Sequence, residues 1–111
     1  MPSQAEWAIL ISYLGGEDVA GGKIRESGSI HWQSPNKGAT NESGFTALPV
    51  GGRNEFAQYL QNGTEAVWWS TTTDPEMIQT YGAFTLYLST TMRSKGVFYK
   101  REGLSIRCIK D

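Results

Sequence analysis

Residues 27–52 constrain the fold of this chain more than any other part of the sequence. The segment is rich in Gly, Ser, Asn, Thr and Pro, and Trp32 and Phe45 stand in it as isolated aromatic residues. Because this composition offers no periodic apolar face, the segment cannot form a regular helix or strand with one buried side. We predict a long irregular loop pinned by these two aromatic side chains, and loops of this length often carry function.

Length, charge and cysteine content narrow the classes of protein to consider. A chain of 111 residues fits a single domain, residues 1–111, around one small core. Ten basic and eleven acidic residues give a formal net charge of −1, which argues against nucleic acid as a partner. No apolar window is long enough for a membrane span, and no signal peptide is recognised. The single cysteine, Cys108, excludes an internal disulfide.

Two helices are predicted before the long loop. Ser3 precedes Glu6 with the spacing of a capping box, in which each side chain binds a free backbone N–H of the first turn. The apolar residues that follow lie on one helical face: Trp7, Leu10, Ile11 and Leu14. Gly15 and Gly16 end this helix. A second helix is expected over residues 17–26, where Gly21 and Gly22 either need packing to persist or permit a close approach to the first helix.

Strands and turns are predicted after the loop. Composition and alternation indicate strands at 66–72 and 84–89, with a short extended piece at 45–48. Residues 96–100 and 104–109 are expected to form a hairpin. Asp74 and Pro75 begin a predicted short helix that runs to Tyr81. Helices followed by several mostly antiparallel strands predict an α+β fold.

Several stretches of the sequence resemble one known family. They read WAILISYLGG, AGGKIRESGSIHWQSPNKGATNESGFTALPVGGR, WWSTT and LSIRCIKD. On these motifs the chain resembles the Fibrobacter succinogenes major paralogous domain family over nearly its whole length. The resemblance implies a C-type-lectin-like fold, related to formylglycine-generating enzymes and phage tropism determinants, with no established enzymatic activity. It also implies an extracellular or cell-surface location in bacteria, while the lack of a recognised signal peptide leaves a cytoplasmic location open.

The resemblance also bears on assembly. Family domains normally extend upstream of the point where this sequence begins, and the upstream part would supply early strands of the lectin-like sheet. We therefore expect this chain to leave a sheet edge or an apolar face uncovered. Because unpaired strand edges invite pairing, self-association into a homo-oligomer is expected.

No metal site, cofactor or catalytic centre is predicted. His31 and Cys108 are the only histidine and cysteine, too few for a zinc site with three or four ligands, and a structural or surface role is favoured for His31. Cys108 alternates with Leu104 and Ile106, so it is expected to face the core, where apolar surroundings raise the pKa of a thiol. Carboxylates are spread singly, whereas calcium sites need a cluster of them. The catalytic cysteines of formylglycine-generating enzymes have no counterparts here.

The polar residues of the loop have two possible roles. Short polar side chains in turns usually bind their own backbone, and this role is favoured over ligand binding. The residues expected to fix the loop and its exit are Trp32, Asn36, Asn41, Phe45 and Arg53. Arg53 and Arg107 could instead clamp a ligand carboxylate, but pairing with an acidic loop residue is favoured for both.

Trp68 and Trp69 carry the main functional signal. Neighbouring residues of a strand point to opposite faces, so one indole is expected in the core and the other either exposed for recognition or packed beneath the loop. The residues expected to bind a ligand lie in or beside loops at 74–81 and 90–95: Trp69, Asp74, Glu76, Tyr81, Arg93 and Lys95. We predict a non-catalytic module that recognises a glycan or a protein. The alternative is an assembly module that self-associates through aromatic surface and sheet edge; an enzyme is least favoured.

Overall fold

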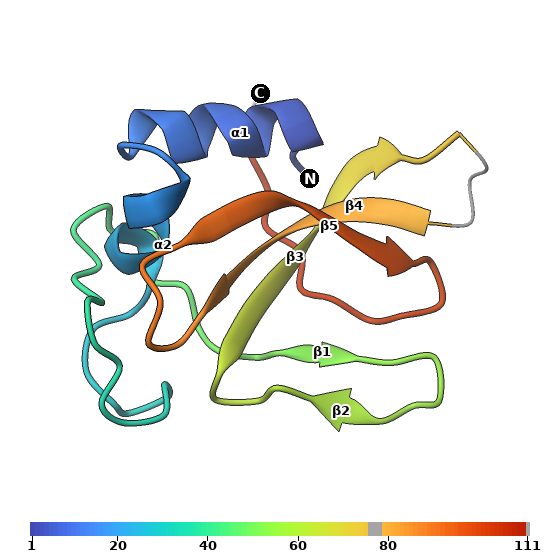
Figure 1. Cartoon of the computed structure of the whole chain (residues 1–111). Helices are drawn as coiled ribbons and strands as arrows, with labels where there is room; N and C mark the ends of the chain where they lie inside the picture. Colours follow the sequence, from blue (N-terminus) through green and yellow to red (C-terminus); the bar gives the residue numbers. More distant parts are fainter. Residues whose placement is uncertain (76–78, 111) are drawn as a thin grey trace.

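The computed structural model describes residues 1–75 and 79–110, apart from the side chain of Lys95 (Figure 1). Its elements, in chain order, are α1 Gln4–Tyr13, α2 Glu17–Ile24, β1 Gly52–Arg53, β2 Tyr59–Leu60, β3 Glu65–Thr73, β4 Gln79–Leu86 and β5 Met92–Tyr99. The predicted α+β architecture, with two helices and small antiparallel sheets, is confirmed. Within the described ranges, no helix is long and apolar enough to cross a membrane.

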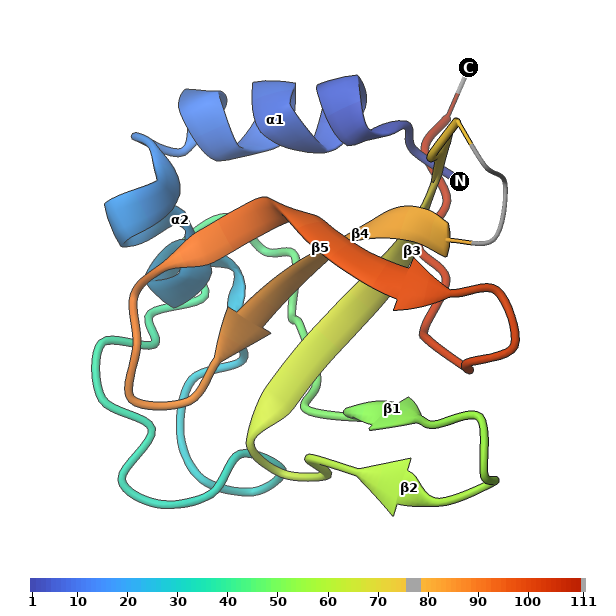
Figure 2. The same cartoon turned by 45° about the vertical axis from the view of Figure 1, so that its right-hand side comes forward.

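The main sheet contains three antiparallel strands in the order β3–β4–β5. Helix α1 lies on one side of this sheet, and the β1–β2 hairpin lies on the other (Figures 1 and 2). The outer edge of β3 is covered, because Gly51 bridges Ala66 and Ser105 bridges Trp68. The outer edge of β5 has no such strand partner in the part of the chain that the structure describes.

Helix α1 forms as its sequence predicts. The Ser3 hydroxyl accepts a hydrogen bond from the Glu6 amide, and the Glu6 carboxylate accepts one from the Ser3 amide at 2.7 Å, which completes the capping box. Gly15 and Gly16, with φ of 110° and 104°, follow the helix in a conformation that favours glycine. The predicted apolar stripe is directed inward: Trp7, Ile11 and Leu14 are buried, and Leu10 is half-buried.

Helix α2 ends at Ile24, two residues before the predicted end, and its glycines pack against two later segments. A Cβ atom on Gly21 would lie 2.4 Å from the carbonyl oxygen of Thr91, between β4 and β5. A Cβ atom on Gly22 would lie 2.4 Å from the carbonyl oxygen of Gly38 in the long loop. The close approach is therefore made to these two segments. Of the two predicted alternatives, packing of the helix is the one that the structure shows, and the approach to the first helix is wrong.

Three aromatic rings form the centre of the core between α1 and the main sheet. Trp7 stacks on Trp68 with ring centroids 5.6 Å apart, and Phe45 meets Trp68 edge-on at 5.5 Å. The Trp7 indole N–H also donates to the carbonyl of Trp69 at 3.4 Å. Phe45 thereby fastens the long loop to the core, and the guanidinium of Arg107 lies 4.3 Å from its ring centroid.

The long loop is irregular, as its composition predicts, and a buried cluster of Arg25, Trp32 and Asn36 fixes its first half. We call this the Arg25 cluster. The Arg25 guanidinium donates to Asn36 Oδ1 at 2.9 Å and to the carbonyl of Lys37 at 2.8 Å, and it lies 5.3 Å from the Trp32 ring centroid. The Asn36 side-chain amide, on a residue with φ 46°, donates to the carbonyls of Glu26 and Gly28. Burial lowers the pKa of Arg25, and its described partners are all uncharged.

The second half of the loop is fixed by hydrogen bonds within the loop itself. The Trp32 indole N–H donates to the carbonyl of Ala47 at 2.8 Å. Asn41, at φ 51°, accepts from the Thr46 amide at 2.8 Å and donates to the Thr46 hydroxyl at 2.9 Å. These side chains bind the loop's own backbone and neighbours, which is the behaviour expected of short polar residues in turns.

Arg53 holds the exit of the loop through its backbone rather than its side chain. Its amide and carbonyl bond to Gly103 at 2.8 and 2.7 Å. The predicted pairing of Arg53 and Arg107 with acidic residues is not formed among the described residues. Arg107 instead donates to the carbonyl of Phe45 at 3.1 Å.

The region after β3 differs from the prediction. Strand β4 begins at Gln79, so the helix predicted through Tyr81 is wrong over residues 79–81, while residues 76–78 lie outside the described part. The strand predicted at 84–89 begins earlier and ends at Leu86, and β5 begins at Met92 rather than residue 96. Pairing of β4 with β3 and of β5 with β4 decides these boundaries, and local sequence signals do not report such long-range pairing.

The C-terminal segment does not form the second strand of the predicted hairpin. Residues 104–110 contain no named strand, and Ser105 makes only an isolated bridge to β3. Without a ladder to hold the alternation, Cys108 and Ile106 are exposed. The prediction that Cys108 faces the core is therefore wrong.

Candidate functional site

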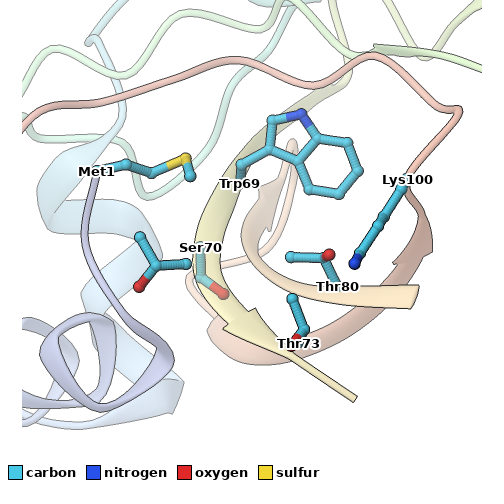
Figure 3. A pocket seen from close by; sticks show the side chains of 7 residues that line it. Met1, Trp69, Ser70, Thr73, Thr80 and Lys100 are labelled. Carbon is cyan, nitrogen blue, oxygen red and sulfur yellow. The ribbon is translucent and has the colours of Figure 1, made fainter. Parts of the chain in front are cut away.

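A shallow pocket of about 380 Å³ opens where β3 ends and β4 begins, beside the residue that follows β5. Its lining residues are Met1, Trp69, Ser70, Thr71, Thr73, Thr80 and Lys100. Figure 3 shows the Trp69 indole between the side chains of Met1 and Lys100. We call this site the Trp69 pocket.

Strand alternation directs Trp69 into the pocket. Trp68 is buried in the core, so Trp69 points to the other face of the sheet, where it is half-buried. The ring of Phe98 meets the Trp69 ring edge-on, with centroids 6.3 Å apart. Gly82, the partner of Trp69 on β4, leaves room for this contact, because a Cβ atom there would lie 3.1 Å from the Phe98 ring. The indole is thus supported on one side and open to the pocket on another.

Threonine and serine hydroxyls lie beside the indole. Ser70 donates to the carbonyl of Tyr81, so its hydrogen is already used. Thr80 is only 7% exposed, and its hydroxyl forms no hydrogen bond with the described residues, yet it is not sealed from solvent. Thr73 is its partner across β3 and β4. Buried polar groups usually have a partner, and the pocket is the space from which a partner can reach Thr80.

Lys100 supplies the one charged side chain among the described lining residues. It is exposed, and Figure 3 shows its ammonium group pointing toward Thr80. No carboxylate in the described ranges pairs with it, whereas the next residue, Arg101, pairs with Glu55 and lies over the Tyr99 ring. The pocket therefore combines an aromatic surface, an available hydroxyl and a cation.

Only part of the predicted ligand-binding surface lies at this pocket. Trp69 lines it, whereas Asp74 is outside the lining and accepts a hydrogen bond from the Gln79 amide at 3.4 Å. Tyr81 points to the opposite face of the sheet from Trp69, because it neighbours the partner residue Gly82. Glu76 lies outside the described residues.

The second predicted loop, 90–95, lies at the other end of the sheet. Arg93 is a residue of β5 paired with Phe84, and it is exposed away from the pocket. The carbonyl of Thr90 accepts from the amide of Gly22 in α2, so this segment supports the helix. Lys95 is also a β5 residue. The prediction that residues 90–95 form a loop beside Trp69 is wrong.

Lys100, Thr73 and Thr80 line the pocket but were not predicted from the sequence. These residues meet only because the three strands pair in a register that is interrupted between Trp69 and Thr73 and again between Gly82 and residue 84. A one-residue change of register would move a side chain to the other face. The sequence shows only that Lys100 follows the aromatic residues Phe98 and Tyr99, and this position alone does not identify a binding site.

A second, wider hollow of about 780 Å³ lies between α1 and the long loop. The side chains of Arg107 and Phe45, which line it, contact each other.

The remaining titratable residues that the structure describes form no second site. His31 is exposed, with Nδ1 2.8 Å from the Glu26 carboxylate. Burial raises the pKa of Glu65 in β3. Across the described ranges, no three residues among His, Cys, Asp and Glu gather closely enough to hold a metal ion.

The fold and the pocket define a small α+β domain with a pinned loop and a shallow aromatic site. The sequence model of the Fibrobacter succinogenes major domain matches residues 1–110, and the chain belongs to this family. This confirms the family resemblance drawn from the sequence motifs. A search of curated proteins and a search of solved structures each found no match.

Proposed function

We propose that this chain is a non-catalytic recognition module with a C-type-lectin-like fold, and that it binds its ligand in the Trp69 pocket. The half-buried Trp69 indole, open to the pocket beside available hydroxyls, carries this proposal. An indole combines a broad apolar face with a polar N–H, and such residues dominate recognition surfaces. The family resemblance supports the lectin-like fold and an extracellular or cell-surface location.

A glycan suits this pocket better than a protein segment does. The faces of sugar rings are partly apolar and their rims carry hydroxyl groups, so one side can stack on Trp69 while the rim bonds to Thr80 or Thr73. A standard protein interface buries a much larger area than a pocket of this size provides. The described lining offers hydroxyls and an amine but neither a histidine nor a carboxylate to act as a base, which supports binding over catalysis.

Trp69→Ala is expected to weaken glycan binding about 30-fold or more, the effect of losing a central aromatic residue worth about 2 kcal/mol. A glycan array should identify ligands, and titration calorimetry should compare the variant with the unmodified protein. Trp69→Phe keeps an aromatic face and should retain part of the affinity. Unchanged binding in the alanine variant, with the fold intact by circular dichroism, would place recognition elsewhere on the surface.

An assembly role is the second candidate, and the outer edge of β5 favours it. This strand is eight residues long, and its outer edge has no strand partner among the described residues. Two copies can pair β5 with β5 in an antiparallel arrangement about a two-fold axis. Val97 is 45% exposed on this strand and would be covered by such pairing.

If β5 mediates assembly, light scattering at about 50 µM should report a dimer, because association is driven by protein concentration. Val97→Arg should shift the population to monomer by placing a charge on the strand edge. Ile30→Arg, on the exposed part of the long loop, is the matched control and should leave the dimer unchanged. A monomer in the unmodified protein would rule out this role.

A further inference from the structure

The charge in the Trp69 pocket is distributed unevenly, and this restricts the ligand. Trp69 forms a neutral wall, and Lys100 on the other side places its ammonium group toward Thr80 (Figure 3). Asp74, the residue that follows β3, is outside the lining, and its carboxylate accepts a hydrogen bond from the Gln79 amide. No described carboxylate therefore offsets the Lys100 charge inside the pocket.

Thr80 adds a second, independent sign that the pocket receives a polar ligand. It is more than nine-tenths buried, but its hydroxyl has no hydrogen-bond partner among the described residues. Thr80 lines the pocket, so water can bind its hydroxyl in the free protein and a polar group of a ligand can take the place of that water. The ammonium and the hydroxyl thus face the same small space.

We propose that the pocket selects an anionic saccharide, a sugar ring that carries an acidic group. The ring stacks on Trp69, the acidic group binds the Lys100 ammonium, and a ring hydroxyl bonds to Thr80. This inference rests on the proposed glycan-binding function and names the class of sugar. A carboxylate or a sulfate would supply the same contact, because a lysine ammonium binds anions as a point charge without the paired geometry of arginine.

A neutral sugar uses this arrangement less well. It would leave the Lys100 ammonium either facing a neutral group or hydrated beside the ligand, whereas an acidic group gains a charge-assisted hydrogen bond. A nucleotide is disfavoured, because its phosphates call for several cations or a glycine-rich loop at a helix terminus. The described pocket offers one cationic side chain and no helix terminus.

Matched sugars test the proposal on the full chain. The probes are trisaccharides of galacturonate, mannuronate and guluronate, the carboxyl-reduced neutral form of each, and a sulfated galactose trisaccharide. Titration calorimetry is run at low and at raised salt. At least one acidic probe is expected to bind about tenfold more tightly than its neutral counterpart, and raised salt should reduce the difference. Comparing the affinity of the sulfated probe with the affinities of the uronate probes shows whether the pocket prefers a sulfate or a carboxylate.

Two variants remove the charge, one inside and one outside the pocket. Lys100→Gln should abolish the preference for the acidic probe, and Lys100→Arg should keep it. Arg93→Gln makes the same change in net charge on an exposed β5 residue away from the pocket and should have no effect. Thr80→Val, which preserves shape, should weaken acidic and neutral probes alike.

The outcomes separate this inference from the proposed function. Equal affinity for acidic and neutral probes, with binding still lost in Trp69→Ala, overturns the anionic preference and leaves the glycan-binding proposal standing. A preference that survives Lys100→Gln also overturns it. Absence of binding to every probe overturns it as well, and the glycan array then decides whether any sugar is bound.

Discussion

Asn36→Ala is expected to lower the free energy of unfolding by about 4 kcal/mol, because it removes the neutral acceptor from a buried guanidinium. In the Arg25 cluster, Asn36 accepts from Arg25 at 2.9 Å and also satisfies two backbone carbonyls. Alanine would leave all three groups without this partner, and the guanidinium of Arg25 is fully buried, so water cannot easily replace the lost acceptor there. It would also occupy a backbone conformation at φ 46° that asparagine tolerates better. Urea unfolding followed by circular dichroism measures the loss.

Asn41→Ala is the matched control for this prediction. Asn41 shares the residue type and the left-handed backbone conformation, but it lies on the outer part of the same loop, where its two hydrogen bonds go to Thr46. Water can replace those bonds, so the expected loss is only about 1 kcal/mol. Equal losses for the two variants would show that backbone conformation, rather than the buried guanidinium, determines the effect.

Trp7→Ala is expected to cost a similar amount, about 4 kcal/mol, through the cavity that it leaves in the core. Trp7 is 1% exposed and stacks on Trp68. Its ring also lies 6.2 Å, centroid to centroid, from Phe45, so the loss should reach the long loop. Chemical denaturation gives the free energy, and amide hydrogen exchange should show faster opening of residues 40–47.

Ile9→Ala tests whether burial is the cause of that loss. Ile9 lies on α1 two residues from Trp7, but it is 68% exposed. Surface substitutions of this kind usually change stability by less than about 0.5 kcal/mol. A small loss in Trp7→Ala, comparable to that of Ile9→Ala, would mean that the aromatic core does not hold α1 on the sheet.

Local signals predicted the N-terminal half of this fold well. The capping box of α1, its apolar stripe and its glycine stop depend on residues within one or two helical turns, and the structure reproduces them. The irregular loop also follows from composition alone. The sequence predicted that Asn36 would stabilise the loop. It did not identify Arg25 as the partner, because nothing in the spacing indicates that the side chain of a basic residue at the end of α2 points into the core.

The structure of the C-terminal half and of the pocket is set by strand pairing between distant residues, which the sequence does not reveal. Asp74, Pro75 and Glu76 indicate a helix start, yet strand β4 occupies 79–86 because it pairs with β3. Cys108 was placed in the core by alternation, which has meaning only where a strand ladder exists. Lys100 and Thr80 reach one pocket through the register of three strands, and Trp69 was predictable because alternation within one strand is local.

The uncharged partners of Arg25 have a consequence for the conditions under which the domain can work. Arginine stays protonated throughout the physiological range, and amide and carbonyl acceptors do not titrate there. Buried contacts are also poorly screened by ions. The Arg25 cluster should therefore persist at low pH and at high salt. High salt would weaken the binding of an acidic ligand at Lys100 but should leave the long loop in place.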